Sequence, residues 1–111
     1  MEKFVINGGR RLSGEVNISG NKNASLAILA AVALCDEPCR IENLPAITDV
    51  AVMVSIFREL NANINFIDKN IIEIDPSRIV NREVPHRLAH LIRTSYYFVG
   101  ALLGRFGRAK V

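Results

Sequence analysis

Residues 19–34 read SGNKNASLAILAAVAL, a polar turn followed by an almost wholly apolar run. The run has the composition of a helix that is apolar on nearly every side, and such a helix must be buried on nearly every side. Gly20, Lys22 and Asn23 lie at its N-terminus. Free N–H groups at a helix N-terminus, together with a lysine, make an anion site. An exposed, asparagine-capped helix end with an incidental lysine fits the local pattern equally well.

The composition of the chain limits its function class. Half of the 111 residues are hydrophobic, which is enough for the core of one domain or of part of one. The net charge is +3 and no aromatic residues interleave with the basic ones, which argues against nucleic-acid binding. The apolar runs are too short to span a membrane or are interrupted by Arg93, and residues 1–15 lack a signal-peptide core. We therefore expect a soluble, cytoplasmic protein.

Hydrophobic periodicity and turn residues predict alternating strands and helices. A hairpin is expected at the end of the first unit, and Thr48 is expected to cap the second helix. The expected strands are 3–7, 14–19, 40–43, 63–67, 71–74 and the beginning of another at 109–111, and the expected helices are 22–34, 49–60 and 85–104. The fold class is therefore α/β (α+β), with one βαβαββ unit over residues 15–75 and the start of a second over residues 86–111.

Two of the expected helices, 22–34 and 85–104, carry apolar residues on most of their faces. A chain of this length cannot easily surround both of them. We expect their remaining faces to be covered by further chain or by another subunit. By itself the chain is expected to self-associate, because apolar helix faces and open strand edges would otherwise contact water.

Three further groups of side chains are candidates for chemistry. Arg93, inside an apolar helix, is either a snorkelling or ion-paired residue or one that faces a cleft and holds an anionic ligand. His86 and His90 share a helical face but have no third ligand, so no metal site is expected. Cys35 and Cys39 lack zinc or redox spacing and are expected to be partly buried thiols. No cofactor motif is present, and we expect no cofactor.

Several motifs occur in an order that resembles the enolpyruvyl transferase family, specifically the branch that uses UDP-N-acetylglucosamine. The resemblance covers essentially the whole chain. The motifs are Gly14-Glu15-Val16-x-Ile18-Ser19-Gly20-x-Lys22-Asn23-Ala24, Ile41-Glu42-Asn43-Leu44-Pro45, Thr48-Asp49-Val50, Leu91-Ile92-Arg93-Thr94-Ser95-Tyr96-Tyr97 and Gly100-Ala101-Leu102-Leu103-Gly104-Arg105-Phe106-Gly107.

The resemblance implies the inside-out α/β barrel of this family, with helices inside and sheets outside. Residues 1–21 would be strands of the other domain, and residues 22–111 would form a partial domain. Lys22 and Asn23 would contact phosphoenolpyruvate, and Arg93 would contact UDP-N-acetylglucosamine. The enzyme would transfer enolpyruvyl to the sugar 3-hydroxyl and release phosphate, the first committed step of peptidoglycan synthesis.

In the family, the loop that carries the general acid follows soon after the position of Val111. No catalytic residue is therefore expected within the chain, which we expect to be inactive alone. One alternative is a non-catalytic anion-binding or interaction module. Another is an enzyme of the 3-phosphoshikimate branch, in which the motif at the lysine resembles Lys-Ser followed by a serine and an arginine. Asn23 and Ala27 favour the UDP-sugar branch.

Overall fold

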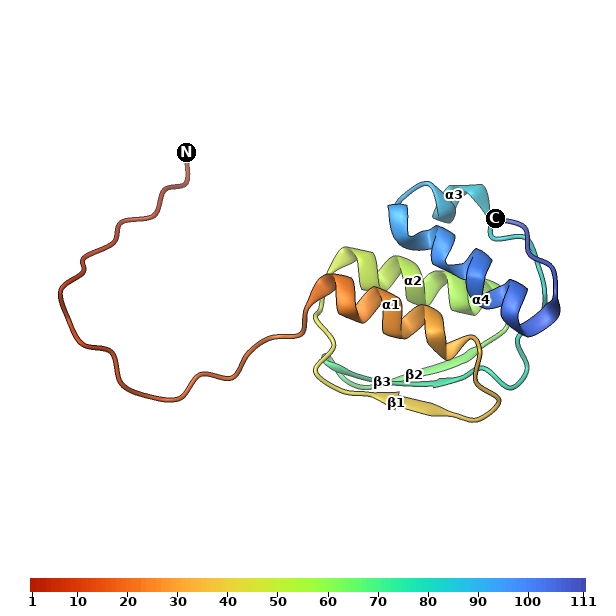
Figure 1. Cartoon of the computed structure of the whole chain (residues 1–111), viewed down its shortest axis with the longest axis horizontal. Helices are drawn as coiled ribbons and strands as arrows, with labels where there is room; N and C mark the ends of the chain where they lie inside the picture. The colour runs from red at the N-terminus through yellow and green to blue at the C-terminus, as the bar shows by residue number, and fades with distance from the viewer.

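The computed structural model describes residues 1–111. An extended N-terminal arm, residues 1–20, projects from a body of helices and strands (Figure 1). In chain order the elements of the body are α1 (Lys22–Val32), β1 (Cys39–Ile41), α2 (Thr48–Glu59), β2 (Asn63–Asp68), β3 (Ile71–Asp75), α3 (His86–Ala89), the 3₁₀ helix η1 (Arg93–Tyr96) and α4 (Tyr97–Phe106). The α/β fold class is confirmed, and α1 to β3 form the βαβαββ unit without its first strand.

The sheet has three antiparallel strands in the order β1-β3-β2. Alternation along the central strand β3 buries Ile72 and Ile74 against the helices, while Glu73 between them lies on the outer face. The expected hairpin is confirmed, and Asn70 in its turn donates from Nδ2 to the Leu44 carbonyl at 2.6 Å. That hydrogen bond ties the hairpin to the segment that leads into α2.

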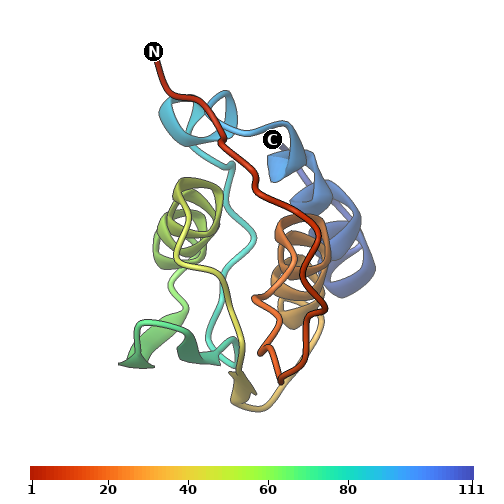
Figure 2. The ribbon, with the colours of Figure 1, turned by 90° about the vertical axis from the view of Figure 1, so that its left-hand side faces the viewer.

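Helices α1 and α2 cover one face of the sheet, and α4 packs beside α1 on the side away from the sheet (Figures 1 and 2). Leu26 and Leu29 of α1 are fully buried in the shared core. Phe57 of α2 and Phe98 of α4 meet edge to face, with ring centroids 5.1 Å apart. One continuous core therefore holds the sheet and the three longer helices together.

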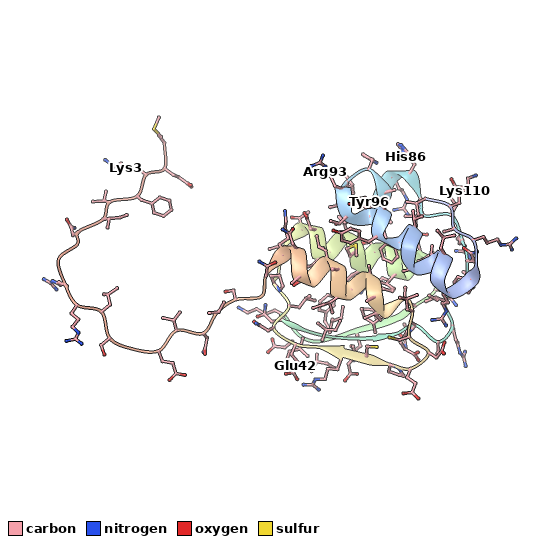
Figure 3. All side chains as sticks on the ribbon, viewed as in Figure 1. Lys3, Glu42, His86, Arg93, Tyr96 and Lys110 are labelled. Atoms are coloured by element: carbon pink, nitrogen blue, oxygen red, sulfur yellow. The ribbon has the colours of Figure 1, made fainter.

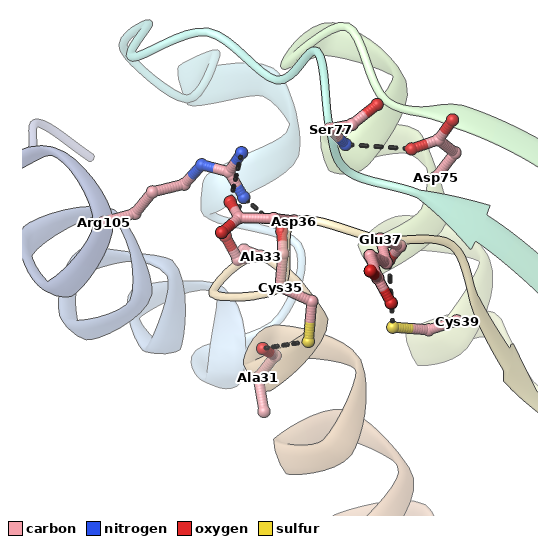
Figure 4. Close-up of polar contacts among 9 residues, drawn as sticks. All are labelled: Ala31, Ala33, Cys35, Asp36, Glu37, Cys39, Asp75, Ser77 and Arg105. Carbon is pink, nitrogen blue, oxygen red and sulfur yellow. Dashed lines mark hydrogen bonds and ion pairs between the residues drawn. The ribbon is translucent and has the colours of Figure 1, made fainter.

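Arg105 of α4 holds the C-terminal end of α1, where the last carbonyl groups lack partners within the helix. Its Nη1 donates to the Ala33 carbonyl at 3.0 Å and to the Cys35 carbonyl, and its Nη2 lies 3.5 Å from Asp36 Oδ1 (Figure 4). The guanidinium carbon lies 5.6 Å from the ring centroid of Phe106. The Arg105 side chain is only 14% exposed, so its hydrogen bonds to the two carbonyls join α1 to α4 largely away from water, whereas Asp36 is exposed.

The predicted strands at 3–7 and 14–19 are wrong for this structure, because the arm is extended but unpaired. A strand needs a neighbour for its backbone hydrogen bonds, and the arm leads away from the sheet (Figure 1). Its only hydrogen bond to the body runs from Asn43 Nδ2 to the Ile18 carbonyl at 3.4 Å. The predicted strand at 109–111 is also absent, since a single hydrogen bond from Val84 N to the Lys110 carbonyl makes no ladder.

The single helix predicted at 85–104 is wrong too, because the segment divides into α3, η1 and α4. Ile92 has an extended backbone, with φ −137° and ψ 140°, which ends helical geometry there. Ser95 Oγ donates to the carbonyls of Ala89 and Ile92, as a serine does when it competes with helical hydrogen bonds. The expectation that Arg93 lies inside a helix fails for the same reason.

The cap predicted at Thr48 is the remaining correction. Thr48 is the first residue of α2, and Ile47 occupies the N-cap position without a side-chain hydrogen bond. The other predicted elements form with bounds that differ by at most two residues from those expected. No helix combines the length and apolar character that crossing a bilayer requires.

Replacing Arg105 with methionine should destabilise the chain, because it keeps the packed stem but removes the donors to two carbonyls. We expect Arg105→Met to lower the free energy of unfolding by about 1.5–3 kcal/mol. Urea denaturation followed by circular dichroism measures this loss. Arg108→Met is the matched control, since Arg108 is exposed and its side chain makes no hydrogen bond or ion pair. Equal stability of the two variants would contradict this role for Arg105.

Candidate functional site

Three helices begin at the same end of the body, the end from which the arm leaves. Helices α1, α2 and α4 run side by side with their N-termini toward the arm, and Figure 2 views them from that end. Each helix N-terminus carries a partial positive charge. Their common direction therefore adds three such charges at one end of the molecule and favours an anion there.

Lys22 lies at the start of α1, and the hydrogen bonds around it show how the helix begins. Asn21 is the N-cap, and its Oδ1 accepts from the Ala24 N–H at 3.0 Å. Ser25 Oγ donates to the Asn21 carbonyl at 2.6 Å. Asn23 is exposed and its side chain makes no hydrogen bond within the chain. Asn21 thus serves as the cap, which leaves the Asn23 amide available to a ligand.

Asp49 is the partner of Lys22, a pairing that the sequence pattern does not predict. The Lys22 Nζ lies 3.7 Å from Asp49 Oδ2, in the first turn of α2. The Lys22 side chain is 57% exposed, and ion pairs in such surroundings contribute little. The ammonium group therefore lies near Asp49 and remains accessible to an anion from solvent. The signal that could have found this pair is that both residues begin helices of one βαβαββ unit.

Arg93 is the first residue of η1, exposed and without a hydrogen bond or ion pair. Figure 3 shows its side chain pointing outward on the arm side of the body, next to Tyr96. The Tyr96 side chain is exposed and contacts Tyr97 edge to face, with ring centroids 5.0 Å apart. Arg93 and Lys22 thus belong to the same end of the molecule, although no contact joins them.

An apolar groove of about 410 Å³ runs between α1 and α4. The groove is formed by the faces of these two apolar helices that no other part of the chain covers. The residues that line it are Ala27, Ala30, Ala31, Leu34, Tyr96, Tyr97, Gly100 and Ala101. Further large apolar side chains on the same helices, Ile28 and Leu103, are about half exposed. The groove lacks charged groups, so it suits an apolar partner rather than an anion.

The histidines and the remaining acidic residue of α2 form no catalytic group. His86 and His90 are exposed on α3 and stack with ring centroids 5.1 Å apart. Glu59 pairs with Arg87. No three His, Cys, Asp or Glu side chains lie close enough together to hold a metal ion. Lys22, Asn23 and Arg93 are therefore the candidate site residues at this end of the molecule.

The sequence matches the profile of a family described as EPSP synthase (3-phosphoshikimate 1-carboxyvinyltransferase) over residues 6–111. The structure is similar to that of the enolpyruvyl transferase NikO from Streptomyces tendae, with a TM-score of 0.74 and 38% sequence identity. That similarity covers 90% of this chain and 23% of the NikO chain.

Curated relatives resemble the chain over its whole length. It is 42% identical to UDP-N-acetylglucosamine 1-carboxyvinyltransferase 2 from Lactiplantibacillus plantarum. It is 43% identical to UDP-N-acetylglucosamine 1-carboxyvinyltransferase from Streptococcus pneumoniae and 40% identical to that from Saccharophagus degradans. The chain spans 26% of the length of each of these relatives.

The arm passes closest to the body at Gly20, which gives a test of how the arm is attached beside Lys22. A Cβ added there would overlap the Asn43 carbonyl oxygen and lie 2.8 Å from Pro45 Cδ. We expect Gly20→Ala to lower the free energy of unfolding by about 1–3 kcal/mol in urea denaturation, as overpacking does. Gly8→Ala is the control, because an added Cβ meets nothing within 4 Å there. Unchanged stability of Gly20→Ala would show that the arm does not need this close approach.

Proposed function

The chain belongs to the enolpyruvyl transferase family, and from that membership we propose that it is the N-terminal portion of an enzyme that acts on UDP-N-acetylglucosamine. This enzyme transfers enolpyruvyl from phosphoenolpyruvate to the sugar 3-hydroxyl and releases phosphate, the first committed step of peptidoglycan synthesis. The names of the 40–43% identical relatives support the acceptor. The observation that carries the proposal is the position of Lys22. It begins α1, and α1, α2 and α4 all begin at the same end of the body.

Each proposed site residue has a role that its chemistry and position support. The Lys22 ammonium and the free N–H groups of α1 bind the negative charges of phosphoenolpyruvate. Asn23 orients the same ligand through its free amide. Arg93 binds the UDP-sugar, since an exposed guanidinium without a partner suits phosphate oxygens. These residues bind and orient the substrates without supplying a general acid, so we expect the 111-residue chain alone to be inactive.

The arm supports a two-domain arrangement. We propose that residues 1–21 form strands of a second domain and that residues 22–111 belong to the first. All residues from 1 to 19 are exposed, and the large apolar side chains among them include Phe4, Ile6, Val16 and Ile18. Such side chains need a partner surface. A chain that passes from one domain to the other at Gly20 would place Lys22 in the cleft between them.

Transfer to shikimate 3-phosphate is the second candidate activity. The description of the matching family profile favours it. Asn23 and Ala27 argue against it, because the motif of that branch resembles Lys-Ser followed by a further serine and an arginine. Assays of the intact enzyme with either acceptor distinguish the two activities.

A cytoplasmic location is proposed as well, supported by two free cysteines, which are typical of a reducing compartment.

In the enzyme that contains this chain, replacing Lys22 with glutamine should weaken the use of phosphoenolpyruvate. Loss of one charged contact is worth about 1.5–3 kcal/mol, so we expect Lys22→Gln to raise the KM for phosphoenolpyruvate roughly 10- to 100-fold. Arg93→Gln should instead raise the KM for UDP-N-acetylglucosamine. A steady-state assay of phosphate release measures both.

Lys110→Gln is the control, because Lys110 pairs with Glu83 on the far side of the body (Figure 3). Its kinetic constants should equal those of the unmodified enzyme. A Lys22→Gln enzyme with a normal KM and kcat would remove Lys22 from the phosphoenolpyruvate site.

Self-association of the 111-residue chain is proposed from its exposed surface. The accessible surface is 8095 Å² for a chain of 12.3 kDa. A compact monomer of that mass exposes roughly 6,100 Å², so about 2,000 Å² is in excess, which is more than the roughly 800 Å² that each partner buries in a standard interface. The arm and the apolar groove between α1 and α4 account for much of the exposed apolar surface.

We expect the purified chain to form dimers or larger assemblies in sedimentation velocity experiments, with the proportion rising with concentration. Ile28→Glu, on the exposed face of α1, should shift the population toward monomer because it buries a charge in the contact. Ile67→Glu on β2, with a similar exposure, should leave the assembly unchanged. A monomer at every concentration tested would refute self-association.

A further inference from the structure

The arm contains a dipeptide whose chemistry the proposed function does not use. Asn7 is followed by Gly8, and no other asparagine of the chain is followed by glycine. The side-chain carbonyl carbon of an asparagine lies within reach of the backbone nitrogen of the next residue, and attack by that nitrogen closes a five-membered ring. A glycine in the second position obstructs this attack least, because it has no Cβ.

The surroundings of this dipeptide leave it open to water. Asn7 and Gly8 are exposed, as are residues 1–19 as a whole, and the arm runs away from the body (Figure 1). No backbone hydrogen bond begins or ends within residues 1–19. A Cβ built at Gly8 meets nothing within 4 Å. The Gly8 N–H is therefore accessible to base, and no contact of the fold opposes the rotation at Asn7 that ring closure requires.

Two other asparagines show what such a site lacks when it is protected. Asn17 lies in the same arm and is exposed like Asn7, but Ile18 follows it, and a β-branched side chain crowds the backbone nitrogen. Asn70 lies in the β2–β3 turn, where its Nδ2 donates to the Leu44 carbonyl at 2.6 Å. That hydrogen bond holds the side chain away from its own backbone. Only Asn7 combines exposure, a free side chain and a following glycine.

We propose that Asn7-Gly8 is a modification site at which Asn7 converts, with water as the only reactant, to aspartate and isoaspartate. The Gly8 nitrogen gives its proton to hydroxide and attacks Asn7 Cγ. The bond from Cγ to Nδ2 breaks, and Nδ2 takes a proton from water and leaves as ammonia. Water then opens the cyclic imide, at Cγ to give aspartate or at the backbone carbonyl carbon to give isoaspartate. In total, one amide and one water become one carboxyl group and one ammonia.

The modification changes both the charge and the backbone of the arm. The new carboxylate lowers the net charge of the chain, which is +3 before the reaction, by one. Isoaspartate also carries the main chain through the former side chain, which lengthens the backbone by one methylene beside Gly8 and Gly9. The reaction requires only the exposed arm and uses none of Lys22, Asn23 and Arg93. This inference is therefore independent of the proposed function, and its failure would leave that proposal unchanged.

The test incubates the purified 111-residue chain at low concentration in warm, mildly alkaline buffer. We expect the mass gain that replaces an amide NH₂ with OH, and fragmentation of the arm peptide should locate it at Asn7. Methyl transfer by a purified isoaspartyl methyltransferase measures the isoaspartate. The rate should rise with pH, because the attacking Gly8 nitrogen must first lose its proton. Asn17 should remain unmodified over the same incubation, since it matches Asn7 in exposure but precedes Ile18.

Gly8→Val is the matched variant, because it crowds the attacking nitrogen while the open space around Gly8 leaves the body unaffected. It should lose most of the isoaspartate, and circular dichroism should show an unchanged fold. A synthetic peptide of residues 1–13 serves as the positive control. Three outcomes would overturn the proposal: Asn7 stays intact in the chain while the peptide reacts, Asn17 reacts as fast as Asn7, or Gly8→Val forms as much isoaspartate as the unmodified sequence.

Discussion

The burial of α1 is the interaction on which the rest of the structure depends. Its Leu26 and Leu29 are fully buried between the sheet, α2 and α4, and Arg105 fastens its C-terminal end. The opposite side of the helix, with Ala27 and Ile28, has no cover within the chain. Because a helix that is apolar all round can be satisfied only by neighbours on all sides, α1 both organises the body and leaves an open groove.

The direction of α1 also creates the candidate site. A helix packed beside α2 and α4 in the same direction brings three N-termini to one end of the body (Figure 2). Lys22 and Asp49 meet there although they are far apart in sequence, at a distance of 3.7 Å. The arm leaves at the same place, through Gly20. Membership of the enolpyruvyl transferase family supports the function that we propose for this end, and the packing of α1 explains its geometry.

Local patterns predicted the parts of the fold that local interactions decide. The amphipathic α2 and the hairpin around Asn70 formed where expected, because helix faces and turn residues act over a few positions. The long third helix did not, since Ile92 is extended and Ser95 bonds to carbonyls that a helix would use. The arm strands did not form either, because strand pairing needs a neighbour that residues 1–20 do not reach.

The sequence by itself determined the fold class, the family, and the exposure of Lys22 and Asn23 at the start of an apolar helix. These depend on residue order and on helix capping, which act within one segment. Only the tertiary structure decided that Asp49 accompanies Lys22 and that Arg105 holds the end of α1. Such contacts join separate segments, so they follow from helix direction and core packing.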